Sequence, residues 1–411
     1  MSKTYFFFTL IITSLHFPSF FSLLFPKPST YRFNKLFLLT QNIFNDETYK
    51  DTNVIISINN LYKLLYSFAF FSDSQTRTEV LNFLNNSNLE SVQKEAVKIT
   101  NHQDKIGRGI VPFNLVFTYN DSSLTDEFLR DLIHDLRIFR IDLIPYKKIN
   151  ATFINKRLFD ASKGKLSAVR YISGYQFFGI NNIIITGAYI RAEWDHKFNR
   201  KFTKEFTFYN SNQRISNVEM MHARHLVDFY ENEVFSGIHL SSTLDSLFVW
   251  FFLPKSGRQL KEIYEHINTD DKVKNITHAS QSCYVDYYLP RFTVESEISL
   301  KRHLEKFGIR RVFSKEESTL GYKKGKSISF EDIVHKVRII VDEDGANVKE
   351  RQQNNFGEDK EFSGDDRVKK IILFDRPFVM AVQSEMFIEL DSVVLAKIEN
   401  IDEENTVEIV G

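Results

Sequence analysis

The chain has 411 residues, 53 Lys and Arg balanced by 53 Asp and Glu, and one cysteine, Cys283. This length can build a large core, and the zero net charge gives no global field that would attract nucleic acid or an anionic membrane. A single cysteine excludes an intrachain disulfide and the usual Cys-rich zinc or iron–sulfur site. We therefore expect no nucleic-acid partner and no Cys-bound metal or cofactor.

The N-terminal segment has the pattern of an export signal. After Met1-Ser2-Lys3, no Asp, Glu, Lys or Arg occurs between Tyr5 and Phe25. A short basic start and an apolar run predict a cleaved signal peptide over residues 1–25, and hence a secreted, extracellular protein. Because about 20 apolar residues can span a bilayer, an uncleaved membrane anchor is the alternative, and the protein would contact a membrane only in that case. Candidate glycosylation acceptors of an exported chain are Asn85, Asn120, Asn150 and Asn275.

Helical patterns dominate the first part of the chain and strand patterns the rest. Helical spacing of apolar residues predicts helices at 32–45, 59–71, 125–139 and 258–267, and Thr76 is expected to cap a further helix because Glu79 follows three residues later. Apolar, β-branched runs predict strands at 54–57, 182–190, 225–231, 246–253, 284–294, 333–341, 370–382 and 384–397. No repeat or Gly/Ser-rich linker divides the chain, so this order predicts one α+β unit.

Short motifs in a fixed order carry more information than any one of them. In chain order they are Asn53-Val54-Ile55-Ile56-Ser57, Thr76, Ile154-Asn155-Lys156, Gly164-Lys165-Leu166, Ile185 to Trp194 with Phe198, Thr203 and Phe208, Val218-Glu219-Met220-Met221, Leu253-Pro254, Leu289-Pro290-Arg291-Phe292, Leu304 with Phe307-Gly308-Ile309 and Phe313-Ser314, and Pro377-Phe378. Together they resemble the serpin (serine protease inhibitor) superfamily over nearly the whole chain after the leader.

The resemblance implies one serpin-like α+β domain over residues 30–402, with three β-sheets, eight or nine helices and an exposed reactive-centre loop at about 345–370. In this family a protease cleaves the loop, and the freed segment inserts into the largest sheet and traps the enzyme. The implied hinge of the loop is Glu343, Asp344, Gly345, Ala346, Asn347, Val348, Lys349 and Glu350.

The hinge contains charges that insertion would bury. If Ala346 points into the sheet interior, the period of two also sends Val348 and Glu350 inward. Burying an unpaired Glu costs several kcal/mol. Twelve of the 22 residues from 349 to 370 are charged. The sequence therefore favours a non-inhibitory serpin that acts as a binder, carrier or decoy substrate. The alternative is an active inhibitor of a trypsin-like or cysteine protease, because Gly345 and Ala346 suit insertion.

Spacing leaves the cleaved bond open between two positions. Counting from Gly345 points to Asp359-Lys360, and counting back from Pro377 points to Asp366-Arg367. The basic residues would suit a trypsin-like enzyme, whose specificity pocket is acidic. We expect a monomer whose partner is a serine or cysteine protease.

The resemblance also places residues at the point where the sheet opens. His335 corresponds to the buried histidine of the family's shutter, with Ser57, Asn60 and Thr186 around it, and Trp194 corresponds to the breach above it. A buried histidine needs a hydrogen-bond partner, which Asn60 or Thr186 could provide. A structural role is favoured over a catalytic or metal-binding one, because no partner cluster accompanies His335.

Motifs of enzymes are missing from the sequence. It has no Gly-x-Ser-x-Gly elbow, no phosphate-binding glycine loop and no His-Glu-x-x-His, so we predict no enzymatic activity. His222 and His225 are spaced as metal ligands can be, but no acidic third ligand lies near them in the sequence. We therefore predict no metal site.

Overall fold

The computed structural model describes residues 34–72, 74–86, 88–105, 109–119, 141–146, 150–170, 182–191, 193–242, 247–320, 327–343, 370–386 and 389–402. The leader, the predicted helix at 125–139 and the loop residues 344–369 lie outside this part of the chain. The helices are α1 (Asn34–Phe44), α2 (Ile58–Phe71), α3 (Ser74–Phe83), α4 (Leu89–Lys105), α6 (Ala151–Ala161), α8 (Leu260–His266), α9 (Asp270–Ala279) and α10 (Lys301–Lys306), with short 3-10 turns at Glu47–Tyr49, Arg200–Phe202 and Arg311–Phe313.

The strands form two hydrogen-bonded sheets. They are β1 (Val54–Ser57), β2 (Ile110–Tyr119), β3 (Asp142–Tyr146), β4 (Asn182–Arg191), β5 (Lys204–Tyr209), β6 (Ile215–Glu231), β7 (Phe235–Ser241), β8 (Leu247–Pro254), β9 (Gln281–Pro290), β10 (Phe292–Ser299), β11 (Asp332–Val341), β12 (Lys370–Leu373), β13 (Phe378–Met386) and β14 (Glu389–Ile398). One sheet has five strands in the order β10-β11-β4-β2-β3. The other has nine, in the order β1-β14-β13-β8-β7-β6-β9-β12, with β5 paired to β6.

The long strand β6 divides the nine-stranded sheet into two parts. It pairs with β5 at its start, with β9 from Met220 to Phe229 and with β7 only from Asp228 onward. One part is therefore β5-β6-β9-β12, and the other runs from β6 through β7, β8, β13 and β14 to β1. With the five-stranded sheet, this makes the three sheets of the expected α+β serpin-like domain.

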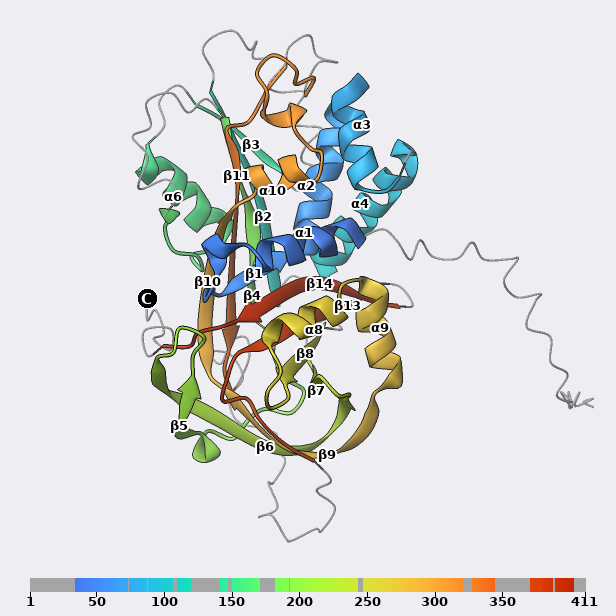
Figure 1. The fold of residues 1–411 in the computed structure, drawn as a ribbon. Coiled ribbons are helices and arrows are strands. Elements are labelled where there is room, and N and C mark those ends of the chain that lie inside the picture. Colours follow the sequence, from blue (N-terminus) through green and yellow to red (C-terminus); the bar gives the residue numbers. More distant parts are fainter. Residues whose placement is uncertain are drawn as a thin grey trace, which may run out of the picture.

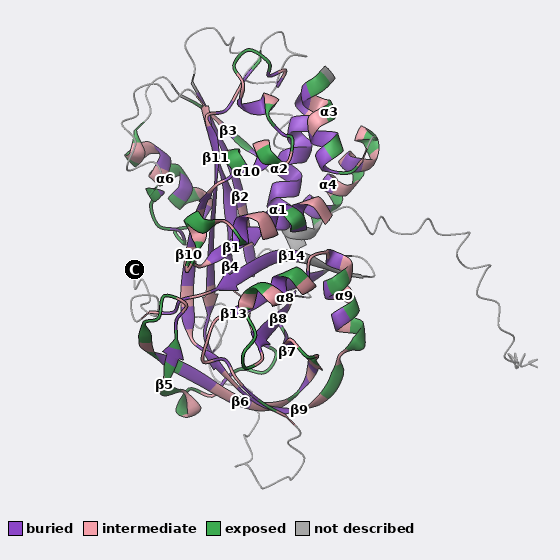
Figure 2. Cartoon of the chain, in the orientation of Figure 1, coloured by how far each residue is buried: buried purple, intermediate pink, exposed green. Residues whose placement is uncertain are grey.

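The five-stranded sheet is covered on both faces. Figure 1 shows α6 on one face and the group α1 to α4 on the other. Every residue of α2 except Phe70 is buried, as expected of a helix that lies in the interior. On the opposite face, Ile154 and Leu158 of α6 pack against β2 and β4. Both faces of the central strands are consequently buried (Figure 2).

Several predicted elements need correction. Helix α3 begins at Ser74, so Thr76 lies inside the helix, and its Oγ1 accepts a hydrogen bond from the Thr319 amide instead of capping. The predicted strand 284–294 is two strands, because the chain turns at Arg291. The predicted strand 370–382 is broken between Leu373 and Phe378. None of the described helices is both long and apolar enough to cross a bilayer.

Candidate functional site: the seam between β4 and β11

The junction of β4 and β11 is where the resemblance places strand insertion, and we call it the seam. The two strands are parallel and directly hydrogen-bonded, in a register that pairs Thr186 with His335 and Gly187 with Lys336. Their approach is close at Gly187, where an added Cβ would lie 1.7 Å from the Lys336 carbonyl oxygen. Only glycine fits there without moving the strands apart. The structure is therefore the closed form of the sheet.

The predicted shutter residues come together on the α2 face of the seam. The buried imidazole of His335 accepts a hydrogen bond at Nε2 from the backbone amide of Ser57, at 2.9 Å. Asn60 donates to the Gly187 carbonyl, and Thr186 Oγ1 donates to Asn114 Oδ1 at 2.6 Å. The ring is thus held by the main chain at the start of α2, and not by the side chains of Asn60 or Thr186.

Burial determines the charge of His335. Removal from water lowers the pKa of its imidazole to about 3, so the ring is neutral at physiological pH. Asn114 of β2 is the member of this group that the sequence reading missed. It lies in one row with Thr186 and His335 across β2, β4 and β11. The indication in the sequence was a single amide side chain, Asn114, within the apolar run of β2.

The predicted breach residue Trp194 closes the end of the seam. Its side chain is buried, and its Nε1 donates to the Asp342 carbonyl at 2.8 Å. The Asp342 carboxylate in turn binds Arg191 at the end of β4. These contacts tie the end of β11 to the end of β4, so the seam is closed at the point where a returning strand would enter.

The first hinge residue, Glu343, is fixed in place. Its carboxylate is buried, accepts a hydrogen bond from Thr203 Oγ1 at 2.9 Å and lies 3.9 Å from Arg291 Nε. Its carbonyl accepts from the Phe198 amide at 3.1 Å. The other hinge residues and the candidate scissile residues lie outside the described residues. These are Asp344, Gly345, Ala346, Asn347, Val348, Lys349, Glu350, Asp359, Lys360, Asp366 and Arg367.

The two ends of the 344–369 segment are attached to different sheets. The chain leaves β11 of the five-stranded sheet after Glu343 and returns at Lys370, the first residue of β12, which pairs in parallel with β9. Arg376 then donates to the Pro254 carbonyl at 2.8 Å just before β13 begins. The loop therefore begins beside the seam and ends at the edge of another sheet.

The two histidines with metal-ligand spacing do not share a site. His222 Nε2 lies 2.5 Å from Asp286 Oδ1, and its ring stacks on Tyr288 with centroids 4.3 Å apart. His225 stacks on His196 instead, with centroids 4.8 Å apart. Within the described ranges, no group of three or more His, Cys, Asp or Glu is arranged to hold a metal ion.

Three predicted glycosylation acceptors can be placed, and all three are exposed: Asn85, Asn150 and Asn275. Asn150 also caps α6, because its Oδ1 accepts from the Phe153 amide. Asn120 lies outside the described residues.

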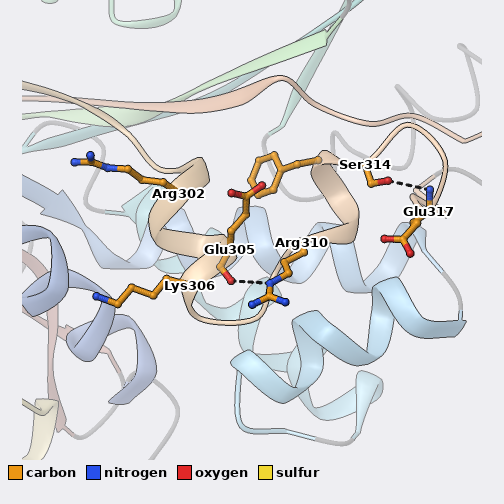
Figure 3. A pocket seen from close by; sticks show the side chains of 7 residues that line it. Arg302, Glu305, Lys306, Arg310, Ser314 and Glu317 are labelled. Carbon is orange, nitrogen blue, oxygen red and sulfur yellow. Dashed lines mark hydrogen bonds between the residues drawn. The ribbon is translucent and has the colours of Figure 1, made fainter.

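A surface pocket of about 500 Å³ lies beside α10, away from the seam (Figure 3). Its lining carries both signs of charge, with Arg302, Lys306 and Arg310 beside Glu305 and Glu317. Arg310 Nε is already engaged by the Glu305 carbonyl at 3.2 Å. The pocket includes no shutter or hinge residue, and its mixed charge selects neither an anion nor an apolar ligand.

The chain is similar to known proteins over most of its length. The family model described as Serpin (serine protease inhibitor) matches residues 36–388. Antichymotrypsin-2 of Bombyx mori is 23% identical over 307 residues, which cover 72% of this chain and 79% of that protein. The plasma serine protease inhibitor of Bos taurus is 26% identical over 234 residues, which cover 56% of this chain and 55% of that protein.

Two solved structures share the fold. Native protease nexin-1 with heparin superposes with a TM-score of 0.75 at 16% identity, covering 90% of this chain and 98% of that one. The thyroxine-binding globulin complex with thyroxine gives a TM-score of 0.73 at 17% identity, covering 91% of this chain and 99% of that one.

Proposed function

The chain belongs to the serpin family, and on that premise we propose that it is a secreted, non-inhibitory serpin whose loop serves as a decoy substrate for a protease. Binder and carrier are the other non-inhibitory roles, and both share the central claim that the cleaved loop does not insert. Relatives named as protease inhibitors and a structural neighbour named for thyroxine binding both occur, so membership alone leaves inhibition open.

The observation that carries this proposal is the burial of the seam on both faces. Residues 183–190 of β4 and 332–339 of β11 are buried. A strand that enters between them would place one set of its side chains toward α2 and the alternate set toward α6. The hinge sequence would then send Glu350 to one face and Lys349 and Arg351 to the other. An unpaired buried charge costs several kcal/mol, so insertion is slow or unfavourable.

Inhibition in this family depends on a competition between loop insertion and hydrolysis of the acyl-enzyme. Trapping requires insertion to finish before water hydrolyses the acyl-enzyme. If insertion is slowed by charge burial, hydrolysis wins and the protease leaves intact. The protein then behaves as a substrate.

Active inhibition is the second candidate, and the closed end of the seam favours it. The Trp194–Asp342 contact, the fixed Glu343 and the neutral His335 form an intact closed sheet with a loop attached beside it. On this reading, Gly345 and Ala346 begin insertion and the charges farther along only slow it.

We also propose how the protein is exported, modified and partnered. Export through residues 1–25, glycosylation at the exposed asparagines, a monomeric state and a serine or cysteine protease as partner all fit a secreted serpin. The leader predicts that mature protein from a secreting host begins after residue 25, which N-terminal sequencing would test.

Incubation with trypsin and denaturing electrophoresis distinguish the two candidates. A decoy substrate yields two fragments cut within 346–370, no band of protease bound covalently to the serpin, and full recovery of trypsin activity. A covalent complex that survives denaturation, with stoichiometric loss of trypsin activity, would contradict the proposal and establish inhibition.

A further inference from the structure

The hairpin of β5 and β6 carries an exposed apolar pair, Tyr209 and Ile215, at its closed end. The two residues lie directly opposite each other in the register, so their side chains share one face of the hairpin. Tyr209 is 53% exposed and Ile215 is 67% exposed. We call this pair the hairpin patch. Two large apolar side chains that adjoin each other form a contact surface, unlike a single exposed residue.

The last described residues of the chain bind the same hairpin. The Ile401 amide donates to Asn210 Oδ1 at 2.8 Å, and Ser216 Oγ donates to the Ile401 carbonyl. Asn210 Nδ2 lies 3.5 Å from Asp402 Oδ1. Asn210 and Ser216 are the sequence neighbours of the two patch residues. The chain beyond Asp402 therefore starts beside the hairpin patch.

Residues 403–411, which we call the tail, have a sequence that suits an extended segment on an apolar surface. They lie outside the described residues, and four of them, Thr406, Val407, Ile409 and Val410, are β-branched. In an extended chain, side chains alternate between two faces. Val407 and Ile409 would consequently share one face, as the two patch residues do.

The tail is long enough to place this face on the patch. Five residues separate Asp402 from Val407, and they span up to about 17 Å when extended. Side chains two residues apart in a strand are about 6.8 Å from each other, and the Cβ atoms of an opposed cross-strand pair are about 5 Å apart. The two apolar pairs thus match in spacing. The tail is tethered beside the patch, at an effective concentration on the order of millimolar, so a small contact is enough to hold it.

Charge also favours the tail as the occupant of the patch. The tail has three carboxylates, Glu403, Glu404 and Glu408, and no basic residue. The hairpin turn presents Arg214, which is exposed and directly precedes Ile215. An exposed pair of opposite charges adds little affinity, but it selects an acidic segment over a basic one.

We propose that the tail docks on the hairpin patch as an extended segment, with Val407 and Ile409 packed against Tyr209 and Ile215. The patch is then a binding surface for a segment of the same chain. This inference is independent of the proposed function, because it involves neither the seam nor the loop.

Disulfide trapping in the Cys283→Ser background, which has no other cysteine, tests the docking. The test pair is Ile215→Cys with Ile409→Cys. Cysteine is itself small and apolar, so the contact keeps its character. The matched control is Asn212→Cys with Ile409→Cys, because Asn212 is exposed and its amide donates to Asn400 Oδ1 at 3.4 Å, equally close to the start of the tail.

Under mild oxidation, the test pair should form an internal disulfide at least ~10-fold faster than the control pair, because docking raises the local concentration of one thiol at the other. A tail that is only tethered would meet both positions at similar rates, and that result would overturn the proposal. Denaturing electrophoresis without reductant separates the internal disulfide from a covalent dimer. A dimer as the main product would assign the patch to a second copy of the chain and would also overturn the proposal.

Hydrogen exchange provides a test without cysteines. Deletion of residues 403–411 should make the amides of residues 209–216 exchange at least ~5-fold faster, because the tail no longer covers them. The amides of residues 225–229, farther along β6, serve as the internal control and should not change. Ile215→Ser in the full chain should produce the same local increase as the deletion. Unchanged exchange at 209–216 in the deletion variant would overturn the proposal.

Discussion

The two faces of the seam close it in different ways. On the α2 face, neutral hydrogen bonds join both strands to the start of α2, since His335 of β11 accepts from the Ser57 amide and Asn60 donates to the Gly187 carbonyl of β4. On the α6 face, Lys336 of β11 binds Glu295 and Glu297 of β10 and the Ala168 carbonyl in the segment after α6. The polar contacts at the seam are therefore neutral on the α2 face and charge-assisted on the α6 face. His335 and Lys336 are neighbours in β11 but lie on different faces of the seam, because adjacent side chains of a strand point to opposite faces.

The largest effect should come from breaking the charged face. Lys336→Met leaves two carboxylates shielded and uncompensated, so we expect a loss of about 3–5 kcal/mol in the free energy of unfolding. Urea unfolding at pH 7 measures it. E295Q/E297Q/K336M should recover most of that loss, because neutral side chains remain in place of unpaired charges. A Lys336→Met variant as stable as the wild type would mean that the ion pairs of Lys336 with Glu295 and Glu297 do not stabilise this face.

Acid should act on the neutral face through His335. The folded pKa of about 3 lies below the ordinary value of 6.5, so the unfolded chain takes up a proton first as the pH falls. The stability associated with His335 is complete above pH 6.5 and is lost as the pH falls toward 3, at up to about 1.4 kcal/mol per pH unit. His335→Gln, which keeps an acceptor for the Ser57 amide, should show a shallower fall between pH 6 and 4. Parallel pH profiles of the two proteins would contradict the assignment.

The smallest effect is expected at Thr186. Thr186→Val leaves Asn114 Oδ1 without its 2.6 Å donor in the interior, which should cost about 1–3 kcal/mol. Exchange of the amides at 165–170 should stay unchanged, since that segment lies on the other face. Faster exchange there would show that the two faces of the seam are coupled.

The sequence predicted the bounds of the two seam strands well and the bounds of several other strands poorly. Strands β4 and β11 were placed within one residue of their ends, because both are rich in Ile and Val. The first half of β6 was missed, since polar residues are interspersed there with the buried Val218, Met220, Met221 and Ala223. The division at Arg291 was missed because apolar residues flank it on both sides.

Side-chain partners depend on register, which one sequence does not provide. The shutter residues could be assembled only through the family resemblance, and the resemblance did not indicate that a main-chain amide binds His335. The charged pairs of β10 and β11 could not be predicted from the sequence, because Glu295-Ser296-Glu297 and Lys336-Val337-Arg338 are far apart and meet only through the β10–β11 pairing. Their spacing was the only signal: two acids lie two residues apart in one segment, and two bases lie two residues apart in another.

Thermal unfolding tests most directly whether the cleaved loop stays out of the seam. The trypsin-cleaved protein is compared with a cleaved variant that carries small hinge residues: Lys349→Thr, Glu350→Ala, Arg351→Thr and Gln352→Ala. Cleavage within the loop should leave the unfolding temperature of the natural sequence unchanged, whereas it should raise the unfolding temperature of the variant. A large rise for the natural sequence would show that its charged loop had entered the seam, contrary to the proposed non-inhibitory function.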